Sequence, residues 1–99
     1  RLIGYNTDQY GLLMLIKKHK INLQNKNIIV LGNGGAAITV VKTLLDNFKN
    51  NIYIWGRNTT KTNKLINTFD KHLCKGRILR YKEFLNTRYI VFNCISLNN

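Results

Sequence analysis

The chain has 99 residues, which is enough for one domain with a small core and too few for two. Its net charge is +12, but the lysines are scattered through a chain that is also rich in Asn and Ile, so we expect no nucleic-acid partner. The apolar run at residues 12–16 is far too short to cross a membrane, and Cys74 and Cys94 lack the spacing of metal ligands, which indicates a cytoplasmic protein with free thiols.

The first predicted element is a helix over residues 9–20, which follows a good N-cap at Thr7 or Asp8. Residues 12–16 make this helix apolar nearly all round, so we expect it to be buried on more than one side. Lysines fill its last turn, where they complement the helix dipole. A polar connection over residues 21–26 then leads to the centre of the chain.

Residues 27–38 are the central stretch and read NIIVLGNGGAAI. The unalternating run of β-branched and apolar residues is typical of a strand buried on both faces of a parallel sheet. The residues after it match the G-x-G-x-x-G/A pattern of a dinucleotide-binding turn, here Gly32, Gly34 and Ala37. Gly32 allows a sharp turn, Gly34 leaves room for a pyrophosphate, and Ala37 lets helix and strand pack closely. The N-terminus of the helix then offers free N–H groups to the phosphates.

Strands and helices alternate through the rest of the chain. The helix after the glycines carries one apolar stripe, made of Ala37, Val40, Val41, Leu44, Leu45 and Phe48. Four further elements are predicted from composition and periodicity: a strand at residues 51–55, a helix at 60–72, a strand at 77–81 and a strand at 88–94, with a helical turn at 82–85. We expect the strand at 88–94 to be buried, because it is almost wholly apolar.

This alternation predicts an α/β fold, a Rossmann-type doubly wound parallel sheet of about four strands preceded by an interdomain helix. A complete dinucleotide-binding fold has more strands, so we expect a fragment of a longer protein. Residues 1–22 would form an interdomain segment and helix, and residues 23–99 a Rossmann domain that is incomplete at its C-terminal end.

The end of the second strand indicates which dinucleotide the fold binds. An acidic residue about 20 positions after the glycines would accept a hydrogen bond from the ribose 2′-OH and favour NAD, but none is present. Arg57 stands there instead, and Lys61 follows one helical turn later. Because a planar guanidinium binds a phosphate through two hydrogen bonds, this pattern favours NADP.

Three motifs together resemble those of the shikimate dehydrogenase family, in the same order and at the same spacing. They are GYNTDQYG from Gly4 to Gly11, GNGGAA from Gly32 to Ala37, and GRNTTK from Gly56 to Lys61. The resemblance implies an enzyme of the shikimate pathway of aromatic amino-acid and chorismate biosynthesis, which reduces 3-dehydroshikimate to shikimate with NADPH. The N-T-D-x-x-G element makes it specific, because a generic Rossmann domain has no reason to carry it.

The resemblance also implies roles for individual residues. Asp8 would contact the substrate hydroxyls and act in catalysis beside a lysine of an N-terminal substrate domain that is missing here. The pyrophosphate would be held by the glycine turn, which consists of Gly32, Asn33, Gly34, Gly35 and Ala36. The 2′-phosphate would be held by the loop after the second strand, through Gly56, Arg57, Asn58 and Lys61. Since the catalytic lysine lies outside these residues, the fragment alone is expected to be inactive.

This chain departs from the family pattern at several positions. The usual N-R-T is Gly56-Arg57-Asn58, Asn33 replaces a common Ala, and Cys94 and Ile95 replace the usual Ala and Thr after the fourth strand. Quinate dehydrogenase, glutamyl-tRNA reductase and a non-catalytic NADP-binding module are the alternatives. Glutamyl-tRNA reductase has no reason to carry the N-T-D-x-x-G element.

Overall fold

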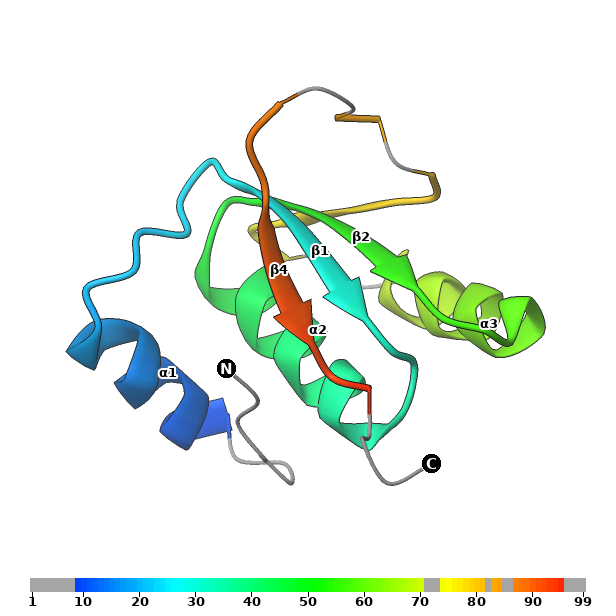
Figure 1. Cartoon of the computed structure of the whole chain (residues 1–99), viewed down its shortest axis with the longest axis horizontal. Coiled ribbons are helices and arrows are strands. Elements are labelled where there is room, and N and C mark those ends of the chain that lie inside the picture. The colour runs from blue at the N-terminus through cyan, green and yellow to red at the C-terminus, as the bar shows by residue number, and fades with distance from the viewer. Residues whose placement is uncertain (1–8, 71–73, 82, 85–86, 96–99) are drawn as a thin grey trace.

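A computed structural model describes residues 9–70, 74–81, 83–84 and 87–95 of the chain (Figure 1). The described elements alternate along the chain as predicted. They are α1 (Gln9–Lys18), β1 (Asn27–Leu31), α2 (Gly35–Asn47), β2 (Asn51–Trp55), α3 (Thr59–Asp70), β3 (Arg77–Leu79) and β4 (Ile90–Asn93). Two parts of the predictions lie outside the described residues. They are the proposed N-caps Thr7 and Asp8, and residues 71–72 at the end of the helix predicted over residues 60–72.

The four strands form one parallel sheet in the order β3-β2-β1-β4, which confirms a partial Rossmann-type α/β fold. β1 lies at the centre, with Leu31 in register with Trp55 of β2 and with Asn93 of β4. The carboxyl ends of β1, β2 and β4 therefore meet at one edge of the sheet, where ligands bind in open α/β folds.

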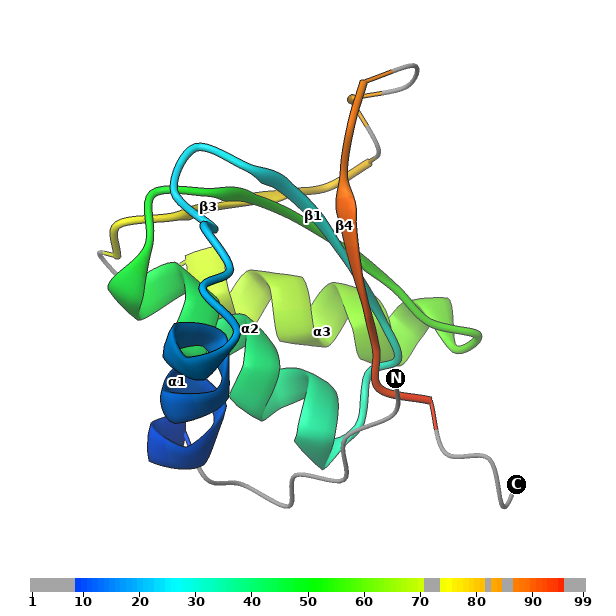
Figure 2. The same cartoon turned by 60° about the vertical axis from the view of Figure 1, so that its left-hand side comes forward.

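The helices lie on one face of this sheet (Figure 2). Strand side chains that alternate onto this face, such as Ile28 and Ile52, are fully buried against them. The apolar stripe predicted for α2 is confirmed, since Ala37 to Leu45 contribute five core residues and Phe48 is partly buried. No helix of the described residues is long and apolar enough to cross a membrane.

The opposite face carries a smaller cluster of apolar side chains. Ile29, Leu79 and Phe84 are buried there, and Leu31 and Tyr53 are partly buried against them. Phe84 comes from the segment between β3 and β4, and its ring lies 6.0 Å from that of Tyr89. Within the described part of the chain, no helix covers this face.

Two burial predictions are wrong, and both errors come from position in the fold. Among the described strands, β4 lies at the edge of the sheet and pairs with β1 alone, so Val91 is 48% exposed although the strand is apolar. α1 packs against α2, but only Leu12 and Ile16 of α1 are buried, and Met14 is 49% exposed. The helical turn predicted over residues 82–85 is also not seen at Glu83 and Phe84, which are not helical. Residues 82 and 85 lie outside the described residues.

Candidate cofactor-binding site

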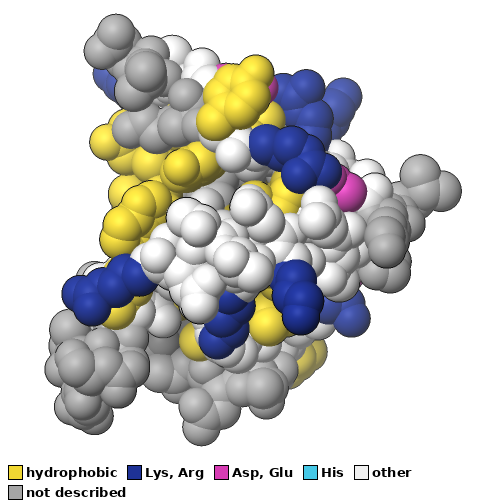
Figure 3. Space-filling view, turned by 90° about the vertical axis from the view of Figure 1, so that its right-hand side faces the viewer, with side chains coloured by type: hydrophobic (Ala, Val, Ile, Leu, Met, Phe, Trp, Pro, Cys, Tyr) yellow, Lys and Arg dark blue, Asp and Glu magenta, His cyan; other side chains and the backbone are white. Residues whose placement is uncertain are grey.

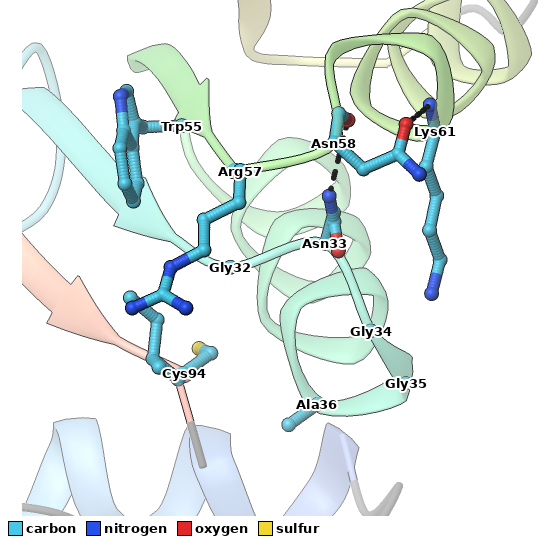
Figure 4. A pocket seen from close by; sticks show the side chains of 12 residues that line it. Gly32, Asn33, Gly34, Gly35, Ala36, Trp55, Arg57, Asn58, Lys61 and Cys94 are labelled. Carbon is cyan, nitrogen blue, oxygen red and sulfur yellow. Dashed lines mark hydrogen bonds between the residues drawn. The ribbon is translucent and has the colours of Figure 1, made fainter. Parts of the chain in front are cut away.

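An open pocket of about 550 Å³ lies at the carboxyl edge of the sheet, where β1, β2 and β4 end (Figure 4). Every residue predicted to hold the cofactor lines this pocket. The full lining consists of Gly32, Asn33, Gly34, Gly35, Ala36, Trp55, Gly56, Arg57, Asn58, Lys61, Cys94 and Ile95. The fold therefore brings together two loops that are about 25 residues apart in the sequence.

The floor of the pocket is the turn that leaves β1. Gly32 has a φ of +118°, a conformation that side-chain-bearing residues rarely adopt. Its N–H donates to the carbonyl of Trp55 at 2.6 Å, and a Cβ on Gly32 would lie 3.1 Å from the carbonyl oxygen of Cys94. The turn is thus enclosed between the ends of β2 and β4, and it needs glycine for both space and backbone conformation.

The N-terminus of α2 faces the pocket without a side-chain cap. Gly34 is the N-cap residue with φ −90° and ψ −164°, and its missing side chain leaves the first N–H groups of the helix without a side-chain acceptor. A Cβ on Gly34 or Gly35 would meet no atom within 4 Å. The first turn of α2 also has no acidic residue, so free N–H groups and the positive end of the helix dipole are open to an anion.

A second loop, Gly56 to Asn58, joins β2 to α3 and carries the cationic side of the pocket. The Oδ1 atom of Asn58 accepts a hydrogen bond from the Lys61 N–H at 3.0 Å, which caps the helix that presents Lys61. The Arg57 side chain extends toward the side where β4 ends, and Lys61 lies on the opposite side of the glycine turn (Figure 4). The two cations therefore flank the turn.

Positive side chains are also spread over the neighbouring surface of α3. On the face seen in Figure 3, Lys and Arg side chains form several separate groups. Arg80 makes an ion pair with Asp70 at the C-terminal end of α3. Arg57 and Lys61 are distinguished from the rest by their place at the pocket.

The side of the pocket toward which Arg57 extends also carries apolar side chains. Trp55 and Ile95 are 43% and 36% exposed, and they lie in the pocket lining with Cys94. Burial raises the pKa of the Cys94 thiol to about 11, so it is protonated at neutral pH and is a poor nucleophile. Among the described residues, no group of three His, Cys, Asp or Glu side chains could hold a metal ion.

Sequence reasoning left Trp55 out of the site, and it named Cys94 and Ile95 only as departures from a family pattern. A signal was available, because the carboxyl ends of adjacent parallel strands share one edge of the sheet. The residues that end β2 and β4 could therefore have been predicted to lie beside the turn after β1. Asp8, the predicted substrate residue, lies outside the described residues, and the structure does not place it.

Comparison with known proteins gives one consistent family. The family model described as shikimate/quinate 5-dehydrogenase matches residues 14–99. The shikimate dehydrogenase (NADP(+)) of Vibrio campbellii is 38% identical over 72% of this chain and 26% of its own length. The corresponding enzyme of Prochlorococcus marinus is 37% identical over 93% of this chain and 30% of its own length.

The match extends to a protein with a different name. The shikimate biosynthesis protein AroDE of Chlamydia pneumoniae is 33% identical over 96% of this chain and 19% of its own length. The chain spans about a fifth to a third of the length of the curated relatives it matches. No solved structure matches this chain.

Proposed function

Because this chain belongs to the shikimate/quinate 5-dehydrogenase family, we propose that it forms the NADP-binding part of an enzyme that reduces 3-dehydroshikimate to shikimate. The observation that carries the proposal is the composition of the pocket. Its uncapped helix N-terminus and its two cations are donors for phosphate groups, and they lie at the sheet edge where dinucleotides bind.

The residues of the pocket fit NADP in charge and in shape. The open N–H groups at Gly34 and Gly35 suit the pyrophosphate, because no side chain separates the backbone from the pocket. Arg57 would bind the 2′-phosphate through its guanidinium. Lys61, near the N-terminus of the helix that Asn58 caps, would add positive charge. Among the described residues, the pocket lining has no carboxylate, which would repel that phosphate.

The cofactor, Asp8 and a lysine would have separate roles in the proposed reaction. When bound, NADPH supplies the hydride that reduces the substrate carbonyl. Asp8 would hold a substrate hydroxyl through a charge-assisted hydrogen bond, from a segment of residues 1–22 that joins the Rossmann domain of residues 23–99 to a substrate domain. The proton for the new hydroxyl would come from a lysine outside these residues.

A steady-state assay of the full-length protein tests this proposal. We expect shikimate-dependent formation of NADPH from NADP⁺, with much lower rates when NAD⁺ replaces NADP⁺. Turnover of quinate in place of shikimate would assign the protein to quinate oxidation instead. Tight NADP⁺ binding without turnover of either compound would support a non-catalytic NADP-binding module, and absence of NADP⁺ binding would overturn the assignment of the pocket.

A further inference from the structure

We propose that Asn33 is a positioning residue that ties the glycine turn after β1 to the loop before α3. This inference rests on the proposed function, since it concerns how the two halves of the NADP pocket are held at a fixed separation. The partner of Asn33 is Thr62, a residue of α3 that does not line the pocket.

The connection consists of three hydrogen bonds among the side chains of Asn33 and Thr62 and the backbone carbonyl of Asn58. The Asn33 Nδ2 group donates to the Asn58 carbonyl at 3.4 Å (Figure 4). It also donates to the Thr62 hydroxyl at 3.2 Å. The Thr62 hydroxyl in turn donates to the same Asn58 carbonyl at 3.0 Å. Thr62 is only 7% exposed, so water competes weakly for its hydroxyl.

The glycine at position 56 is explained by this connection. Gly56 does not have a positive φ, so its backbone conformation does not require glycine. A Cβ there would instead collide with the Asn33 Nδ2 atom and would lie 2.7 Å from the Thr62 hydroxyl oxygen. The Asn33 amide therefore occupies the space that a side chain at position 56 would enter.

Asn33 and Gly56 are two positions at which this chain departs from the family pattern. In that pattern an amide side chain stands at position 56, and a small residue is common at position 33. Here the amide stands at Asn33 and the small residue at Gly56. Because the Asn33 amide fills the space that a side chain at position 56 would enter, the two departures from the pattern are linked rather than independent.

The connection should matter for ligands that occupy both loops at once. The glycine turn and the N-terminus of α2 would hold the pyrophosphate, while Arg57 and Lys61 would hold the 2′-phosphate. Asn33 fixes the separation between these two subsites. Its loss should weaken NADP⁺, which spans both subsites, and should leave adenosine 2′-monophosphate, which has no pyrophosphate, nearly unchanged.

The test is a double-mutant cycle in the full-length protein with Asn33→Ala, Thr62→Val and the combined variant. Thr62→Val is essential because Thr62 cannot touch a ligand in the pocket, whereas Asn33 lines it. Thr68→Val is the matched control, because the Thr68 hydroxyl bonds the carbonyl four residues earlier on the same helix, at 2.9 Å, without contacting Asn33. Dissociation constants for NADP⁺ and adenosine 2′-monophosphate are measured together with melting temperatures.

We expect each single variant to raise the NADP⁺ dissociation constant about 3- to 10-fold, the range for loss of one partly buried hydrogen bond. The combined variant should bind NADP⁺ with the same affinity as the single variant that binds it less tightly. Thr68→Val should bind NADP⁺ like the wild type. Additive effects, equal losses for both ligands, or unchanged NADP⁺ binding would each overturn the inference. Failure of the wild-type protein to bind NADP⁺ would instead overturn the proposed function.

Discussion

Replacement of Gly32 by alanine tests whether the turn after β1 is constrained as the structure indicates. At a φ of +118° an alanine is strained by about 1–3 kcal/mol. Its Cβ would also lie 3.1 Å from the Cys94 carbonyl oxygen, and crowding of this kind adds about 1–3 kcal/mol. Reduced freedom of the unfolded chain returns about 0.4–1 kcal/mol, so we expect a net loss of about 1–6 kcal/mol.

Urea unfolding of the full-length protein, followed by circular dichroism, measures this loss. Gly35→Ala is the matched control because a Cβ at Gly35 would meet no atom within 4 Å and the residue begins α2. We expect Gly35→Ala to keep wild-type stability or to gain up to about 1 kcal/mol from helix propensity. Equal stability for the two variants would refute the claim that Gly32 is held by strain and close contact between β2 and β4.

Two further predictions concern catalysis and the thiol in the pocket. Asp8→Asn keeps a good N-cap but removes a negative charge, so we expect native-like folding and NADPH binding. In steady-state kinetics, kcat should fall about 10²-fold or more. Retention of most of the turnover would mean that Asp8 is only a helix cap. The Cys94 pKa is raised from 9.0 to about 11 by burial, so the folded state holds the proton more tightly than the unfolded state and loses this stability as pH rises from 9 toward 11. Cys94→Ala should therefore show a shallower fall of stability in urea titrations across that range, and an unchanged slope would argue against a buried thiol.

The centre of the fold is predictable from the sequence because its signals are local. An unalternating apolar run, three glycines and a stripe at helical spacing lie within residues 27–48, and they predicted β1, the turn and α2. β2 was predicted with its observed bounds, Asn51–Trp55, for the same reason. Spacing pointed to Gly32, Gly34, Arg57 and Lys61, and the resemblance to the family supplied the other residues of the two loops.

Exposure at the margins of the fold was not predictable from composition. An apolar strand such as β4 reads as buried, but burial depends on whether another strand or helix lies beside it. Val91 is exposed because β4 has β1 on one side only. The hydrogen bond between Asn33 and Thr62 was not predictable from the sequence either. It joins side chains 29 residues apart, and it forms only because the fold places their two loops close together.

The most direct measurement of the central claim is the affinity of Arg57→Ala for NADP⁺ and NAD⁺, determined by titration calorimetry on the full-length protein. Arg57 lines the pocket beside the turn that would hold the pyrophosphate, and only NADP⁺ carries the phosphate that it would bind. Loss of this charge-assisted contact should weaken NADP⁺ by ~1.5–3 kcal/mol, or roughly 10- to 150-fold, and leave NAD⁺ nearly unchanged. Equal effects on the two dinucleotides would contradict the assignment of the pocket to NADP.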